Sequence, residues 1–246
     1  MLVLLPPSET KAHGGDGPPL DLDALSFPAL NPTRDRIASA LVALAADAER
    51  SRDVLGLSPR QSTEVERNAA LRGSPTTGAL HRYTGVLYDA LDVEGLTGSE
   101  RARAHARLAV ASALFGVVRA RDPIPAYRLS AATTLPDLGS LRGLWRPALE
   151  PVLTGLDELV VDLRSGPYAA LARMPDAVTV RVVTDNGTGK RTTVSHHNKA
   201  YKGRLAGALA RATREPATID DLLTAASSAG FKMEQTGEQE LELLVQ

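Results

Sequence analysis

The sequence has 246 residues, of which 43% are hydrophobic and 4% aromatic, and its formal net charge is −1. A chain of this size can bury a large core, and its length fits one large domain or two small ones. The near-zero charge gives no overall attraction to nucleic acid or acidic lipid, so any polyanion site must be a local patch. The sequence contains no cysteine, which excludes disulfides, thiolate nucleophiles and cysteine-ligated metal centres.

The N-terminal segment MLVLLPPSETK lacks the basic lead of a secretory signal, and no later stretch approaches the length of a membrane span. We therefore expect a soluble, cytoplasmic protein.

The first part of the chain is predicted to contain one short strand, a glycine- and proline-rich loop and several helical segments. In chain order these are residues 2–5, 12–32, 33–48, a segment that opens at Ser58, residues 78–91 and a short helix after residue 97. Thr97 and Glu100 have the spacing of a capping box, which predicts the start of that last helix.

The stretch 112–128, with the sequence SALFGVVRARDPIPAYR, is the most informative of the chain. The apolar run 108–118 has the length and composition of a buried strand. Pro123 and Pro125 cannot belong to a central strand, so the chain must leave the sheet there. This pattern places the charged and phenolic groups at a strand end, as in many anion sites. These groups are Arg119, Arg121, Asp122, Tyr127 and Arg128. A surface loop whose Arg and Asp side chains merely pair is the alternative.

The remaining elements are predicted as strands at 158–163, 177–184 and 190–195, helices at 141–153 (interrupted near Pro147), 198–212 and 218–229, and a terminal hairpin of 231–235 with 240–245. Strands and helices mix without strict alternation, and no long linker or repeat divides the chain. The sequence therefore predicts a single α+β or mixed α/β domain over residues 1–246, with a mixed central sheet, flanking helices and a C-terminal hairpin.

Residues 190–214 carry seven Lys or Arg side chains and no Asp or Glu. A one-sided cationic patch attracts phosphates and releases counterions when it binds a nucleic-acid backbone. Lys199, Lys202 and Arg204 belong to the predicted helix of this segment. A solvated helix face that pairs with the acidic tail beyond Glu215 is the alternative.

Polar residues follow the two other apolar strands as well. Those after the first strand are Ser8, Glu9 and Lys11, and those at or after the end of the strand at 158–163 are Asp162, Arg164, Ser165 and Tyr168. If these strands are parallel neighbours, their polar ends converge on one cleft. We expect one cleft to be lined by Ser8, Arg119, Asp122, Tyr127, Arg128, Ser165 and Lys199.

Several familiar motifs are incomplete. His196 and His197 would point to opposite faces of a strand, and no nearby carboxylate completes a metal site. The GTGK sequence at 187–190 lacks the spacing of a phosphate loop. We therefore predict no metal site and assign no cofactor.

The chain resembles the peroxide-stress YaaA family. The matching blocks are LLPPSETK, YTGVLYDAL, ASALFGVVRARDPIPAYRL, GLWRPAL, VVDLRSGPY and SHHNKAYKGR, followed by the terminal GFKMEQTGEQELELLV. Glu9 stands where many members have lysine, and Ala200 replaces a cation of the family's usual basic segment. The resemblance implies a mixed α/β protein with a positively charged cleft and a helix-hairpin-helix-like element. It also implies a role in lowering free iron under hydrogen peroxide stress and the binding of double-stranded DNA.

Two function classes remain open, and of these we prefer the nucleic-acid-binding module. It would lay a nucleic-acid backbone, without sequence preference, along a basic cleft and so limit iron-driven damage. The cations of this cleft would be Arg119, Arg121, Arg128, Lys199, Lys202 and Arg204. An enzyme would bind a small phosphorylated or nucleotide-like anion in the same cleft. In the enzyme, Arg119 and Arg128 would hold the anion, Tyr127 or Tyr168 would pass a proton, and Lys199 would act as base or nucleophile, with Asp122 beside them. An open groove would favour nucleic acid, whereas a closed set of converging side chains would favour the enzyme.

Overall fold

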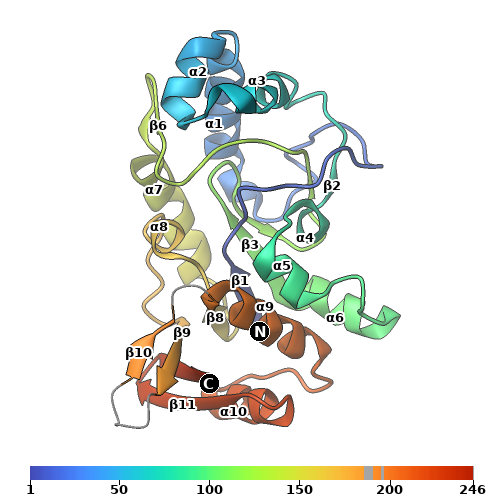
Figure 1. The fold of residues 1–246 in the computed structure, drawn as a ribbon, viewed down its shortest axis with the longest axis vertical. Helices are drawn as coiled ribbons and strands as arrows, with labels where there is room; N and C mark the ends of the chain where they lie inside the picture. Colours follow the sequence, from blue (N-terminus) through green and yellow to red (C-terminus); the bar gives the residue numbers. More distant parts are fainter. Residues whose placement is uncertain (186–190, 195–196, 246) are drawn as a thin grey trace.

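A computed structural model describes residues 1–185, 191–194 and 197–245 (Figure 1). Its centre is a mixed sheet in the order β11-β12-β9-β8-β1-β3-β4, with β10 paired to β9. The strands are β1 (Leu2–Leu5), β3 (Leu108–Ser112), β4 (Gly116–Arg119), β8 (Val160–Asp162), β9 (Val178–Asp185), β10 (Arg191–Thr193), β11 (Lys232–Gly237) and β12 (Glu240–Val245). Two pairs of two-residue strands lie outside it, β2 (Thr77–Gly78) with β5 (Pro123–Ile124) and β6 (Thr134–Leu135) with β7 (Gly139–Ser140).

Helices flank this sheet, as the sequence predicts. They are α1 (Asn31–Leu44), α2 (Ala48–Leu55), α3 (Ser62–Ala69), α4 (Ala79–Arg82), α5 (Val86–Leu91), α6 (Gly98–Arg107), α7 (Leu141–Thr154), α8 (Gly166–Ala169), α9 (Asn198–Arg211) and α10 (Ile219–Ser228), with short 3-10 helices η1 (Pro28–Leu30) and η2 (Pro59–Gln61). In Figure 1, α5, α6 and α9 lie together on one side, and α1, α2 and α3 form a separate group at the top.

Strand β1 lies between β3 and β8 and is parallel to both. Val3 is opposite Leu108 of β3 and Val161 of β8. The three strands therefore end at the same side of the sheet, which we call the carboxyl edge; the opposite side is the amino edge. Polar segments that follow β1 and β8 must start close together at the carboxyl edge.

The predicted single strand over 108–118 is wrong. The structure places two antiparallel strands there, β3 and β4, joined by a buried turn over 113–115. Gly116 has a φ of +73°, a conformation that glycine adopts without strain. The reversal pairs Arg119 with Ala109, near the start of β3. Arg119 consequently lies at the amino edge.

Two distant side chains satisfy the carbonyls of this buried turn. Arg34, fully buried on α1, donates to the carbonyl oxygens of Phe115 at 3.0 Å and Val117 at 2.8 Å. Trp145 of α7 donates from Nε1 to the carbonyl oxygen of Ala113 at 2.8 Å. Buried carbonyls need such donors, since an unpaired one costs about 1–3 kcal/mol. The hairpin therefore depends on tertiary contacts that no local pattern reveals.

Other boundaries follow the sequence more closely. The Thr97–Glu100 capping box is confirmed at the start of α6. The helix predicted over 78–91 is divided into α4 and α5 at Gly85, whose φ is +97°. The helix over 141–154 is continuous through Pro147, contrary to the predicted interruption. The predicted C-terminal hairpin is confirmed as β11 and β12.

Helix α9 runs from the carboxyl edge towards the amino edge. Near its start, Lys202 donates to the carbonyl oxygen of Leu163, which follows β8. At its end, Arg107, directly before β3, donates to the carbonyl oxygen of Leu209. Gly203 lets α9 approach α5 closely, because a Cβ there would lie 2.1 Å from the carbonyl oxygen of Leu87.

Candidate functional site at the carboxyl edge

Lys11 is the central side chain of the candidate site. It follows β1 and is only 7% exposed, although its amine is an ionisable group. Nζ donates to the carbonyl oxygen of Ser8 at 3.0 Å and lies 4.3 Å from the ring centroid of Tyr127 and 5.3 Å from that of Tyr83. Burial, reinforced by the nearby Arg128 charge, lowers the pKa of Lys11 to about 7. A large fraction of its amine is therefore neutral near neutral pH.

A chain of buried hydroxyl groups lies beneath Lys11. Ser112, at the end of β3, is 2.7 Å from the Tyr127 hydroxyl, which is 2.8 Å from the Tyr83 hydroxyl. Ser112 Oγ also accepts from the backbone N–H of Phe115, which fixes its position. Burial raises the pKa of Tyr83 to about 12 and that of Tyr127 above its ordinary value. The hydroxyls thus stay protonated and can relay a proton without carrying charge.

Arg128 provides the site's cation for an anion. Its backbone is clamped by Asn68, which accepts from the N–H of Arg128 at 2.8 Å and donates to its carbonyl oxygen at 2.9 Å. The Arg128 side chain is 15% exposed and donates from Nη2 to Glu9 at 2.9 Å. Glu9 is itself 72% exposed. The backbone of Arg128 is thus anchored, and its largely buried side chain holds an exposed carboxylate that an incoming anion could replace.

Residues that follow β1 and α4 add two further hydroxyl groups to this site. Ser8 Oγ is 3.0 Å from Thr10 Oγ1, which donates to the carbonyl oxygen of Thr84. A Cβ on Gly85 would lie 3.3 Å from Thr10 Oγ1 and 3.5 Å from Ser8 Oγ. The absence of a side chain at Gly85 therefore leaves both hydroxyls uncovered on that side.

The segment after β8 contributes a neighbouring group. Asp162 accepts from two nitrogens of the buried Arg164, at 2.9 and 2.8 Å, so this pair is structural. Ser165 is exposed at the start of α8. Burial raises the pKa of Tyr168, and the charges of Glu9 and Arg128 also act on it. Tyr168 therefore belongs with the Lys11 cluster, as expected for the ends of parallel neighbours.

The expectation that all seven predicted side chains line one cleft is wrong for Arg119 and Asp122. Arg119 binds Glu158, which precedes β8 at the amino edge, at 3.1 Å. Asp122 is buried and accepts from the backbone N–H and the hydroxyl of Ser26 and from the N–H of Arg119. Arg121 is exposed and acts on the pKa of His105 of α6. The β3–β4 reversal carries all three away from the carboxyl edge.

Three of the described cations of residues 190–214 pair with carboxylates. Arg191 binds Glu234 and Glu242, Arg211 binds Asp92 and Arg214 binds Asp221. Lys199 is exposed in the first turn of α9, near the carboxyl edge, and Arg204 is exposed further along it. Lys190, Ser195 and His196 lie outside the described residues.

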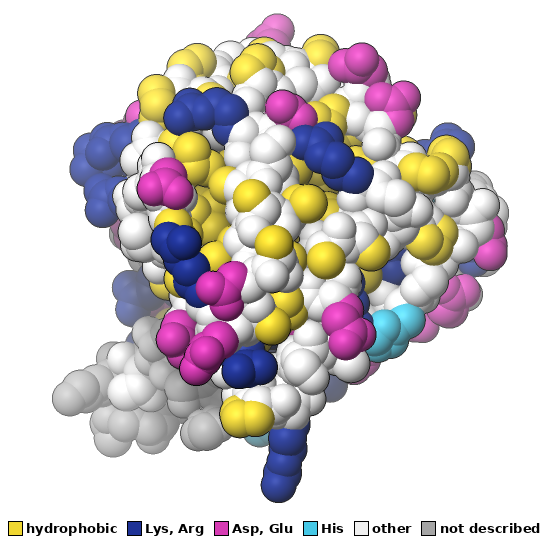
Figure 2. Space-filling view, turned by 90° about the horizontal axis from the view of Figure 1, so that it is seen from above, with side chains coloured by type: hydrophobic (Ala, Val, Ile, Leu, Met, Phe, Trp, Pro, Cys, Tyr) yellow, Lys and Arg dark blue, Asp and Glu magenta, His cyan; other side chains and the backbone are white. Residues whose placement is uncertain are grey.

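Figure 2 shows one face of the molecule, on which Lys and Arg side chains alternate with Asp and Glu outside the grey atoms. Within the described ranges, no group of three or more His, Asp or Glu residues could hold a metal ion. None of the helices described is long and apolar enough to cross a membrane.

Sequence reasoning assigned no role to Lys11, Tyr83 or Ser112, although each stands in or beside a block quoted above. Lys11 follows a predicted strand, which was the available signal. Its burial against two tyrosine rings comes from contacts between segments far apart in the sequence.

Comparison with known proteins places these blocks in a family. The family model described as peroxide stress protein YaaA matches residues 1–236. The chain belongs to this family. It is 47% identical to a UPF0246 protein of Corynebacterium glutamicum, over 96% of this chain and 95% of that protein. A UPF0246 protein of Streptomyces coelicolor is 42% identical, over 95% of this chain and 92% of the relative. A more distant relative, an uncharacterized protein of Campylobacter jejuni, is 26% identical over 83% of this chain. The carboxyl-edge site therefore belongs to a member of the peroxide stress protein YaaA family.

Proposed function

We propose that this protein serves the peroxide-stress response as an enzyme that binds a small phosphorylated or nucleotide-like anion at the carboxyl edge. The observation that carries the proposal is the Arg128–Glu9 pair beside the buried amine of Lys11. A guanidinium on an anchored stretch of backbone, paired with an exposed carboxylate, can exchange that carboxylate for a ligand oxyanion.

Lys11 supplies the chemistry in this proposal. A neutral amine can accept a proton or attack an electrophilic carbon or phosphorus, and burial lowers the pKa of Lys11 to about 7. Tyr127 and Tyr83 donate or accept hydrogen bonds beneath it without ionising. We assign the role of base or nucleophile to Lys11 rather than to Lys199, because Lys199 is exposed and Lys11 is enclosed beside Arg128.

The experiment is a titration of the full chain with inorganic sulfate and with AMP, measured by isothermal titration calorimetry. Arg128→Gln should weaken binding of both by roughly 10- to 100-fold, since charge-assisted hydrogen bonds contribute about 1.5–3 kcal/mol. Arg142→Gln, on the exposed part of α7, is the matched control and should bind as the wild type does. Equal binding by Arg128→Gln and the wild type would refute the site assignment.

Binding of a double-stranded DNA backbone is the second candidate. It is favoured by Lys199 and Arg204, two exposed cations on α9 with no carboxylate partner among the described residues. It is disfavoured by the separation of Arg119 and Arg121 from Arg128, because these cations cannot follow one backbone along a single edge. A small ligand therefore fits the arrangement better than a long phosphate track.

A further inference from the structure

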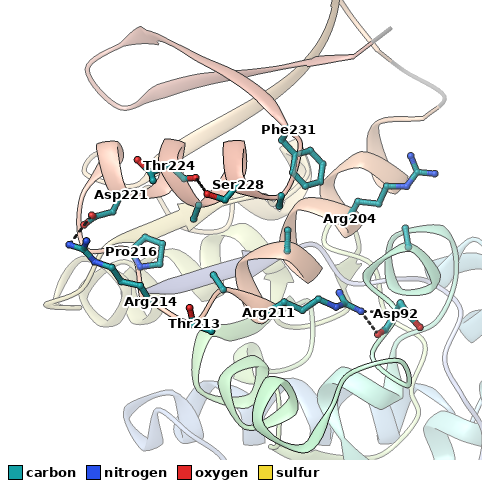
Figure 3. Close-up of a pocket in the computed structure, with 15 residues that line it drawn as sticks. Asp92, Arg204, Arg211, Thr213, Arg214, Pro216, Asp221, Thr224, Ser228 and Phe231 are labelled. Carbon is teal, nitrogen blue, oxygen red and sulfur yellow. Dashed lines mark hydrogen bonds and ion pairs between the residues drawn. The ribbon is translucent and has the colours of Figure 1, made fainter.

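A cavity lies between α9 and α10, away from the carboxyl edge (Figure 3). Its volume is about 800 Å³, which is within the range of small-molecule sites. It lies beside the final turn of α9. At this end of the helix Arg107, which lies at the amino edge, donates to the carbonyl oxygens of Leu209 and Ala212. The walls combine two larger apolar side chains, Phe231 and Pro216, with the alanines at 90, 208, 212, 225 and 229.

The lining of this cavity contains three arginines and two aspartates, and two of the arginines pair with the aspartates. Arg214 pairs with Asp221 at one end, at 3.3 Å. Arg211 reaches Asp92 at the other end, also at 3.3 Å, as the dashed lines of Figure 3 show. Arg204, near that second end, contacts the ring of Tyr201 at 5.4 Å and has no carboxylate partner in the part of the chain that the structure describes. The lining therefore carries one cation in excess.

The bonds of Arg211 are also weak. Its three acceptors, the carbonyl oxygens of Leu91 and Asp92 and a carboxylate oxygen of Asp92, are all 3.3–3.4 Å away. These distances lie beyond the usual 2.7–3.2 Å of a good N–H···O bond. Figure 3 draws the guanidiniums of Arg204 and Arg211 apart, so a single oxyanion would meet one of them. An oxyanion beside Arg204 would give that cation a charged partner, and Arg211 would keep its bonds to Asp92.

We propose that this cavity binds a small amphipathic anion. A carboxylate or phosphate head would lie beside Arg204, and an aliphatic or aromatic body would lie along the alanines beside Phe231. The excess cation favours an anion over a neutral apolar molecule. Asp92 and Asp221 within the same lining would repel a polyphosphate chain, which favours a single head group over nucleic acid.

The test compares decanoate, decyl phosphate and neutral decan-1-ol by isothermal titration calorimetry on the full chain. At least one of the two anions should bind at least 10-fold more tightly than the alcohol. Arg204→Gln should remove most of that advantage and leave the alcohol unchanged; Arg204 is exposed, so the fold should persist. Ala225→Trp should strongly weaken binding of all three by narrowing the cavity.

Two controls separate this cavity from the carboxyl edge. Arg142→Gln should bind the anions as the wild type does. Arg128→Gln should lose anion binding at the carboxyl edge only, and should keep the advantage of anions over the alcohol that Arg204→Gln removes. Equal affinity for anions and alcohol, unchanged anion binding in Arg204→Gln, or undiminished binding in a folded Ala225→Trp would each overturn the proposal. Failure of all three ligands to saturate the wild type would also overturn it, and would leave the sulfate site at Arg128 unaffected.

Discussion

The amine of Lys11 is enclosed although it costs free energy to bury a charge. Its pKa is about 7 in the folded protein and near the ordinary value of 10.5 in the unfolded chain. Between these values the unfolded chain holds more protons, so the free energy of unfolding rises with pH from about 7 to 10.5. Below pH 7 both states hold the proton, and the folded protein bears the full cost of the buried charge.

Replacing Lys11 with methionine should therefore raise the free energy of unfolding at pH 6 and flatten its rise between pH 7 and 10. Each unit of pKa difference corresponds to about 1.4 kcal/mol, so the effect is well above error. Urea unfolding at several pH values measures it, with Lys232→Met on exposed β11 as the control. A variant with the wild-type pH slope would show that Lys11 titrates normally.

The same proton should be linked to ligand binding. When the pH falls below 7, Lys11 gains a charge beside Arg128 and should strengthen the binding of an anion. Sulfate does not titrate in this range, so its affinity should increase from pH 8.5 to pH 6 through the protein alone. Lys11→Met should remove most of this dependence in calorimetric titrations; an unchanged dependence would place the bound anion far from Lys11.

At the scale of elements, local signals were sufficient where the determining contacts are local. The Thr97–Glu100 capping box started α6 as predicted, because its bonds join residues three apart. The β3–β4 turn was missed because it is apolar and buried, and its carbonyls are satisfied by Arg34 and Trp145, distant in sequence. This turn also determines that Arg119 does not belong to the carboxyl-edge site, because it places Arg119 at the amino edge. Strands β1 and β8 are parallel neighbours, so the segments that follow them begin side by side at the carboxyl edge.

The close approach of α9 to α5 gives a prediction about an element. Gly203→Ala would place a Cβ 2.1 Å from the carbonyl oxygen of Leu87, so the helices must separate. We expect the free energy of unfolding to fall by about 1–3 kcal/mol, the usual cost of overpacking. Gly98→Ala in α6 meets no atom within 4 Å and is the matched control, neutral or slightly stabilising. Equal stability of the two variants in urea titrations would contradict this packing.

Across the molecule, the cations discussed above lie in three places: the carboxyl edge of the sheet, its amino edge and the surface of α9. Arg128 and Lys11 lie at the carboxyl edge, whereas Arg119 binds Glu158 at the amino edge. A net charge of −1 adds no general attraction for polyanions. Any binding of double-stranded DNA should therefore be weak, indifferent to sequence and strongly dependent on salt.

Replacing Lys199, Lys202 and Arg204 together by alanine tests whether α9 makes such contacts. If it does, the slope of log affinity against log salt should flatten by about two to three units, roughly 0.9 per lost phosphate contact. Lys202 also bonds to the carbonyl oxygen of Leu163, so thermal unfolding must accompany the measurement. An unchanged slope in a folded variant would exclude α9 as the contact surface.

The exchange of Glu9 for a bound anion at Arg128 is tested by the sulfate affinity of Glu9→Gln. The carboxylate of Glu9 accepts a hydrogen bond from the Arg128 guanidinium. Removing the charge of Glu9 should therefore leave the guanidinium free for sulfate and raise the sulfate affinity about 3- to 10-fold. Arg128→Lys should lower the affinity despite keeping the charge, because lysine loses the planar two-point geometry. Calorimetric titration at pH 7 of the wild type and both variants decides the matter. A Glu9→Gln variant that binds sulfate no better than the wild type, or an Arg128→Lys variant that binds it equally well, would contradict the account.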